Sequence, residues 1–216
     1  MTASRRALAL AGLMTVVVLA TGCGVQLPGA AGVVGEARVS DAELNDSVIQ
    51  TQAALVQYKQ TPVSEATLTQ QNLTRLVTSE LLAVAAQRRN IVVTPGQVDR
   101  TIADAEAQAG AENLRTQLAV NRGVPPSALN SFARDFLIQT AIAESLLPGG
   151  GTDAQSVAVE KYLGALSREL DTRISPRFGT WDAKQLAIGP VPDNLSTLAT
   201  VPVIPQPSDL PTPIRP

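Results

Sequence analysis

The sequence has no histidine, a single cysteine and only two methionines, Met1 and Met14. Both methionines precede Cys23, so the chain beyond that cysteine offers no soft or borderline metal ligand. Zinc, copper and haem sites depend on such ligands, and we therefore expect no metal and no cofactor. Ser-His-Asp and Cys-His catalysis are excluded because both need an imidazole base. These absences predict that the protein is not an enzyme.

Aromatic residues are also scarce, at 3% of the chain. No Gly-rich phosphate loop is present, and the run Gly149-Gly150-Gly151 after Pro148 is typical of a hinge at a helix end. Pairs of carboxylates such as Glu160 and Glu169 fit solvated helix faces better than an acid–base pair.

The one cysteine follows a short apolar run. Arg5 and Arg6 precede an apolar segment from Ala7 to Ala20, and the small residues Thr21 and Gly22 stand directly before Cys23. This order of a basic start, a short apolar stretch and a small-residue cleavage site is typical of a secretory signal peptide. The apolar stretch is too short to span a membrane. The pattern resembles a lipobox, which implies that Cys23 is acylated and becomes the mature N-terminus. The alternatives are a buried cysteine or an ordinary signal with a chance cysteine.

Removal of the leader also removes two of the 17 basic residues, which leaves 15 against 19 acidic ones and a net charge of about −4. This mild acidity argues against a nucleic-acid partner and against electrostatic attachment to anionic lipid. We expect attachment through the lipid alone, to the outer face of the cytoplasmic membrane in a bacterial cell envelope.

The chain divides into four segments. We expect a signal peptide over residues 1–22, a lipid-anchored tether over residues 23–32 and one helical domain over residues 33–188. From Gly189 to Pro216 there are eight prolines in 28 residues, which excludes a regular helix or a central strand. We expect residues 189–216 to be a Pro-rich disordered tail, either an inert spacer or a segment that docks in an aromatic-lined groove.

Helix start signals recur through the expected domain. Ser40 with Glu43 fits a capping box after a short strand at 33–39, and Thr94-Pro95 with Gln97 fits another. Thr61-Pro62 and Pro125-Pro126 favour two further helix starts, and Thr152 with Gln155 has the capping-box spacing. The clearest amphipathic stripe joins residues at spacings of mostly three and four, and its members are Leu73, Leu76, Val77, Leu81 and Val84. A second stripe of Leu44, Val48 and Leu55 is widened by Ile49 and Val56. The fold class is therefore mostly α.

Three segments carry a resemblance to a known family. These are the run from Leu73 to Leu82, the extended turn from Asn90 to Thr94 with the capped helix that follows, and the opening strand from Val33 to Ser40. Together they resemble the N-terminal chaperone domain of SurA and PrsA-type foldases. The segment from Pro176 to Asp182 resembles the closing segment of lipoprotein members from actinobacteria-like envelopes.

The resemblance covers roughly residues 32–188. It implies a helical domain with a short strand pair formed by the N- and C-terminal segments. Many relatives carry a parvulin prolyl-isomerase module where this chain has Pro148 to Gly151, and parvulin sites use paired histidines that are missing here. The resemblance thus implies chaperone-type binding of exported polypeptides without isomerase activity.

Four aromatic residues are candidates for client binding. Phe132 and Phe136 lie one helical turn apart, which favours core positions but leaves a binding role open. Phe178 and Trp181 are expected either to pack a C-terminal strand against the helices, as a clamp, or to bind clients. Two function classes remain: a membrane-tethered holdase for exported polypeptides, or a scaffolding envelope lipoprotein that binds one specific partner. The sequence leaves the clients and the oligomeric state open.

Overall fold

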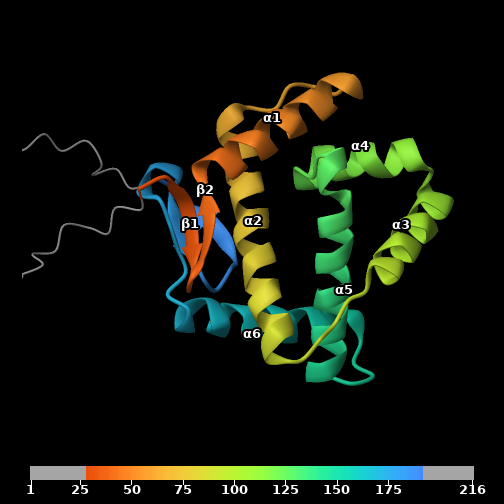
Figure 1. Cartoon of the computed structure of the whole chain (residues 1–216), viewed down its shortest axis with the longest axis vertical. Helices are drawn as coiled ribbons and strands as arrows, with labels where there is room; N and C mark the ends of the chain where they lie inside the picture. The colour runs from red at the N-terminus through yellow and green to blue at the C-terminus, as the bar shows by residue number, and fades with distance from the viewer. Residues whose placement is uncertain (1–27, 192–216) are drawn as a thin grey trace, which may run out of the picture.

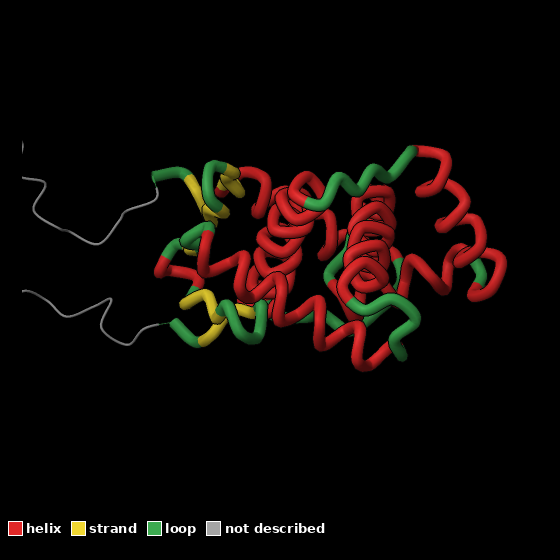
Figure 2. The backbone as a smooth tube through the Cα atoms, turned by 90° about the horizontal axis from the view of Figure 1, so that it is seen from below, coloured by secondary structure: helices red, strands yellow, loops and turns green. Residues whose placement is uncertain are grey.

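The structure is a computed structural model that describes residues 28–191. Within that range six α-helices form the bulk of the molecule, and short strands gather at one end (Figure 1, Figure 2). Cys23, the predicted leader and residues 192–216 of the predicted tail lie outside the described residues. The prediction of a mostly helical domain is confirmed.

The N-terminal and C-terminal segments meet in a three-stranded sheet of order β2-β1-β3. Strand β1 spans Ala30–Val34, β2 spans Ala37–Ser40 and β3 spans Arg173–Ile174, and β1 is antiparallel to both neighbours. The predicted pairing of N- and C-terminal strands is thus present. The prediction of one strand over 33–39 is wrong, because Gly35 has a φ of +59° and turns the chain into a hairpin.

Helix α1 (Asp41–Gln57) starts at the predicted cap, where the Ser40 hydroxyl accepts a hydrogen bond from the Glu43 amide at 3.1 Å. The predicted stripe of Leu44, Val48 and Leu55 is buried. Its predicted widening by two further residues is wrong, since the side chains of Ile49 and Val56 are exposed on the opposite side of the helix.

Helix α2 (Glu65–Arg88) begins three residues later than the sequence predicts. The cap is Ser64, whose hydroxyl accepts from the Thr67 amide at 3.2 Å, and Pro62 stays in the preceding loop. The Ser64 hydroxyl satisfies an amide of the first helical turn that has no partner within the helix. The helix therefore starts after Ser64 and not after Thr61. Leu73, Val77 and Leu81 are fully buried, so the stripe predicted for this helix is confirmed.

Helices α3 (Pro95–Ala109) and α4 (Ala111–Arg122) form an arm on the side of the molecule away from the strands (Figure 1). The predicted capping box of Thr94 and Gln97 is present. Helix α4 ends at Gly123 in the left-handed conformation, as a helix C-cap requires.

A short 3₁₀ turn, η1 (Pro126–Ala128), opens helix α5 (Leu129–Leu146), and helix α6 (Thr152–Glu169) follows. The capping box predicted at the start of α6 is wrong. The cap is Gly151, and the Gln155 side chain turns to Glu144 and to the Leu147 carbonyl instead.

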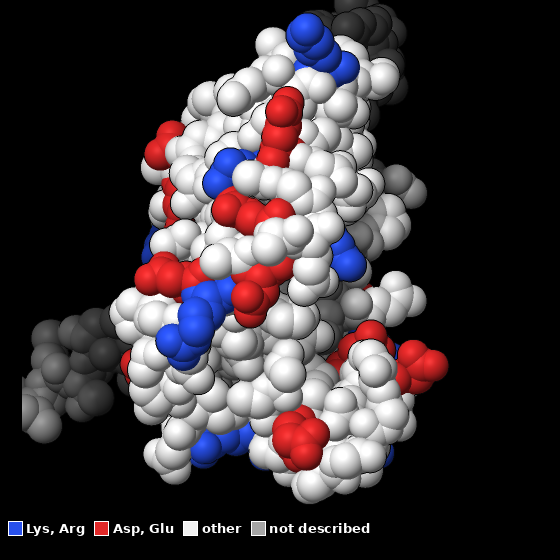
Figure 3. All heavy atoms as spheres, turned by 90° about the vertical axis from the view of Figure 1, so that its right-hand side faces the viewer, with Lys and Arg blue, Asp and Glu red and all other residues white. Residues whose placement is uncertain are grey.

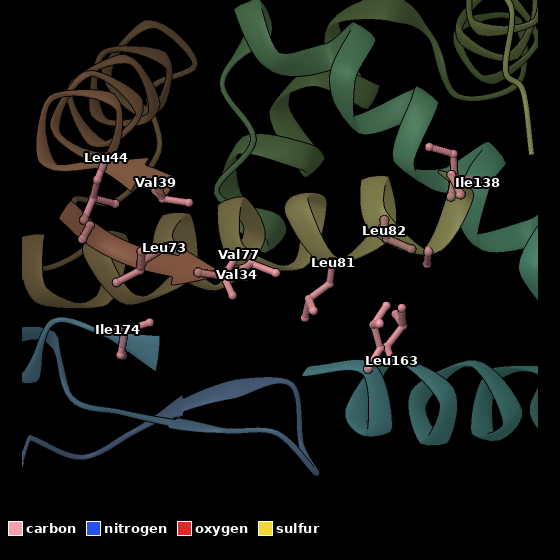
Figure 4. Packing of buried hydrophobic residues seen from close by; sticks show 14 of the residues in the cluster. Val34, Val39, Leu44, Leu73, Val77, Leu81, Leu82, Ile138, Leu163 and Ile174 are labelled. Atoms are coloured by element: carbon pink, nitrogen blue, oxygen red, sulfur yellow. The ribbon is translucent and has the colours of Figure 1, made fainter. Parts of the chain in front are cut away.

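The last elements of the described region are β3, the 3₁₀ turn η2 (Pro176–Phe178) and the antiparallel pair β4 (Thr180–Asp182) and β5 (Ala187–Gly189). One hydrophobic core joins the small sheet to the helices (Figure 4). Val34 of β1, Leu73 and Val77 of α2 and Leu163 of α6 are among its buried members. Helix α2 contacts α1, α5, α6 and the sheet, and is the central element of the fold.

Candidate functional site

A cleft of about 830 Å³ opens between helices α2, α5 and α6. The end of α4 and strand β5 complete its border. Its lining combines a few apolar side chains with many uncharged polar ones. The lining residues from the two long walls are Gln70, Gln71, Thr74, Arg75, Thr78, Ser79 and Leu82 on α2, and Phe132, Asp135, Phe136, Gln139, Thr140 and Ala143 on α5.

The α2 wall is built by two polar rows at four-residue spacing. Gln70, Thr74 and Thr78 form one row, and the second row starts at Gln71 and runs through Ser79. Residues four apart lie on the same face of a helix, so both rows point into the cleft while the Leu73 stripe points into the core. Hydroxyl and amide groups can donate and accept, so this wall can bond to the backbone of many peptides.

The α5 wall supplies the aromatic part of the cleft. Phe132 is half-buried and Phe136, one turn further on, has 54% of its surface exposed. The interpretation of these two residues as core is therefore wrong for Phe136, because α5 turns Ala133, Ile138 and Ile142 toward the core instead. Phe136 is the one aromatic among the exposed large apolar residues of the described range.

A buried polar cluster stands behind the α2 wall. Asn72 is fully buried; its amide donates to the Leu68 carbonyl at 2.9 Å and its carbonyl accepts from Ser47 Oγ at 2.6 Å. Thr51 Oγ1 donates to the Ser47 carbonyl at 2.8 Å. Arg75 Nη2 donates to Ser47 Oγ at 2.7 Å, which ties the cleft wall to helix α1. The cluster joins α1 to α2 and holds Arg75 at the cleft.

Burial dominates the electrostatics around Arg75. Removal from water lowers the pKa of the Arg75 guanidinium, although Asp135 and Glu43 oppose the change. Burial also raises the pKa of Asp135 across the cleft, and Ser79, Arg134 and Arg75 only partly offset it. The pKa of Glu80 is raised by burial and by the negative charges of Glu43 and Asp135. Arg75 and Asp135 thus face the cleft in a poorly hydrated setting.

The other two aromatic candidates do not line the cleft. Trp181 is partly buried against the core, and its indole Nε1 donates to Ser167 Oγ of α6 at 2.7 Å. Phe178 also packs against the core, with the Arg177 guanidinium 4.5 Å from its ring centre. Phe178 and Trp181 thus pack the C-terminal strands against the helices, which is the clamp arrangement expected from the sequence. The clamp holds β5, so that Ile188 forms one edge of the cleft.

Among residues 28–191 no group of three or more acidic, His or Cys side chains is arranged to hold a metal ion. Within the same range, no helix has the length and apolar character needed to span a bilayer. On the face that carries the α3–α4 arm, acidic and basic side chains alternate on a mostly uncharged surface (Figure 3).

A family model described as the SurA-like N-terminal domain matches residues 2–141. The chain belongs to this family. The match reaches from the N-terminal segment to Ala141 in α5, and therefore includes the α2 wall and both phenylalanines of the cleft. Helix α6 and strands β3 to β5 lie beyond it. Comparison with curated proteins and with solved structures gives no match.

Membership of the SurA-like family indicates a chaperone-type, non-catalytic module of the bacterial envelope with a substrate-binding role. It confirms the resemblance inferred from the run around Leu73 to Leu82.

Sequence reasoning missed most of the cleft. Arg75, Asp135 and the polar rows of α2 were not predicted as site residues. A signal for the rows was present, because Gln70, Thr74 and Thr78 repeat every four residues beside the apolar stripe without being charged. No comparable signal marks Asp135, whose position depends on how α5 packs on α2.

Proposed function

We propose that this protein is a lipid-anchored holdase that binds exported, unfolded polypeptides in the cleft between α2, α5 and α6. Cys23 is the proposed lipid attachment site, and the anchor holds the domain at the outer face of the cytoplasmic membrane. The proposed activity is binding alone, without prolyl isomerisation.

The observation that carries this proposal is the exposed Phe136 beside the half-buried Phe132 in an open cleft with a polar rim. An exposed aromatic side chain offers apolar area that a partner can cover, at about 25 cal/mol per Å². The hydroxyl and amide groups of α2 can satisfy the backbone of an extended peptide whatever its sequence. Such a combination favours many clients over one, because little in it depends on a particular side chain.

A pair of variants tests the cleft. Phe136→Ala should reduce the ability of the protein to delay aggregation of two unrelated denatured proteins, such as citrate synthase and reduced α-lactalbumin. Loss of one aromatic anchor typically costs about 1–2 kcal/mol, which is roughly a 5- to 30-fold loss of affinity. Ile49→Ala is the matched control, since Ile49 on α1 is 56% exposed and lies outside the cleft.

If Phe136→Ala and Ile49→Ala lost protection against aggregation to the same extent, a role for the cleft would be contradicted. Such a result would mean that any exposed apolar residue contributes to client binding. Failure of the unmodified protein to protect either client, together with recovery of one partner from envelope extracts, would favour the scaffolding function instead. Thermal unfolding of both variants provides the control for folding, and little change is expected for exposed residues.

A further inference from the structure

Strand β5 borders the cleft, and the described region ends two residues after this strand. Ala187 and Ile188 of β5 line the cleft, and Val191 is the last described residue. Three residues span at most about 11 Å of extended chain, so the segment that follows starts close to the cleft. Trp181 pairs with Ile188 across the β4–β5 ladder and donates a hydrogen bond to Ser167, and these two contacts hold β5 against α6.

The segment at residues 192–216 has the chemistry of a ligand for an aromatic-lined groove. Seven of its 25 residues are proline, and three are charged. The aliphatic residues between the prolines are Leu195, Leu198, Val201, Val203, Ile204, Leu210 and Ile214. Proline-rich chains favour the polyproline II conformation, lose little entropy on docking and bind grooves lined by aromatic rings. Phe132 and Phe136 supply such rings in the cleft.

The length and the net charge of residues 192–216 are compatible with docking in the cleft of the same molecule. At about 3.1 Å per residue, 25 residues in polyproline II extend about 78 Å, whereas α2 is about 36 Å long. A segment of this length can therefore reach across the cleft in either direction. Its charges are Asp193, Asp209 and Arg215, a net of −1, while the cleft lining carries Arg75 and Arg122 against Asp135, a net of +1.

From these observations we infer that residues 192–216 dock in the cleft of their own chain and compete there with clients. The docked segment covers Phe136 while no client is present and is displaced by a client that binds more tightly. The competition rests on the proposed holdase function, whereas the docking itself does not.

The expected effect on client binding is moderate. A short tether gives an effective concentration on the order of 1 mM. If the intrinsic Kd of the segment for the cleft is about 0.2 mM, client affinity falls about sixfold when the segment is present. This is enough to cover Phe136 without blocking a client.

Docking can be tested without any client. The chain has no cysteine after Cys23, so Ser208→Cys in a protein starting at residue 24 accepts one nitroxide spin label. We expect the label to broaden the amide NMR signals of Gln139 and Thr140 in the cleft and to spare Asp104 on the exposed side of α3. The control carries the same label with serine at Leu195, Leu198, Val201, Val203 and Ile204, and should lose the broadening. Equal broadening of the cleft and α3 signals, or none, would overturn the inference.

Competition is tested separately with carboxymethylated α-lactalbumin, a permanently unfolded chain, as the probe. A protein that ends at Val191 keeps every core residue and should bind the probe about sixfold more tightly than the chain to Pro216. A synthetic 192–216 peptide should weaken that binding when added in trans. Equal affinity of the two proteins would contradict competition while leaving the holdase proposal standing. Absence of probe binding by the shorter protein would contradict the holdase proposal, and the spin-label result would still decide docking.

Discussion

Trp181 Nε1 donates a hydrogen bond to Ser167 Oγ at 2.7 Å, and this contact fastens the β4–β5 hairpin to helix α6. Ser167 is buried, so its hydroxyl has little access to water as an alternative partner. The indole also packs against the core and pairs across the ladder with Ile188. Trp181 therefore helps to position the C-terminal hairpin and, through Ile188, one edge of the cleft.

Trp181→Ala should destabilise the protein by about 2–3 kcal/mol, somewhat less than the roughly 3–5 kcal/mol typical of a fully buried tryptophan. Trp181→Phe keeps most of the ring but loses the donor to Ser167, and should cost about 1 kcal/mol. Urea unfolding followed by circular dichroism measures both values. An unchanged midpoint for Trp181→Ala would mean that the hairpin does not depend on this clamp.

Asn72→Ala should destabilise the protein by about 2–3 kcal/mol, because it leaves the buried hydroxyl of Ser47 without its acceptor. Asn113→Ala on the exposed side of α4 is the matched control and should change stability by less than about 0.5 kcal/mol. The comparison uses urea unfolding at pH 7. Similar values for the two variants would show that the buried polar cluster does not hold α1 to α2.

The raised pKa of Glu80 makes its charged form a cost to the folded state at neutral pH. A group with a raised pKa favours folding while it is protonated, below its ordinary value of 4.5, and that contribution is lost as the pH rises through the folded value. Glu80→Gln should therefore be close to wild type near pH 4 and more stable than wild type at pH 7. Glu112→Gln, at an exposed position on α4, controls for the loss of one surface charge. If Glu80→Gln raised the free energy of unfolding by the same amount at pH 4 and pH 7, the effect would not come from the ionisation of Glu80.

Acylation at Cys23 predicts that Cys23→Ala protein leaves the membrane fraction or keeps its leader. Each buried methylene contributes about 0.8 kcal/mol, so two or more acyl chains give a stable anchor and their loss releases the domain. Fractionation and mass spectrometry of the N-terminus measure the outcome. Correctly cleaved, membrane-bound Cys23→Ala protein would contradict lipidation at this residue.

The protein should not accelerate prolyl cis–trans exchange. Uncatalysed exchange takes roughly tens to hundreds of seconds, and the chain contains no histidine with which to build a parvulin site. A peptide-based exchange assay with a parvulin as positive control measures this. Turnover that rises with protein concentration would contradict the prediction.

Local sequence determined the secondary elements well where capping and periodicity agreed. The Ser40 cap, the Thr94 capping box and the Leu73–Val77–Leu81 stripe are all present, since each depends on residues within a turn or two of one another. Errors arose where two local signals competed. Ser64 replaced Thr61 as the cap of α2, and Gly151 replaced Thr152 at α6 because Gln155 found partners in the preceding helix.

Composition and short motifs by themselves determined the helical class, the family resemblance and the candidate lipid site at Cys23. The tertiary structure alone decided which apolar residues stay accessible. Phe132 and Phe136 have the spacing of core residues, yet the packing of α5 on α2 and α6 directs Phe136 into the cleft. Likewise, only the fold brings Arg75 of α2 close enough to Asp135 of α5 for their charges to interact. Such contacts join residues about 60 positions apart, and their geometry depends on how whole helices pack rather than on any local pattern.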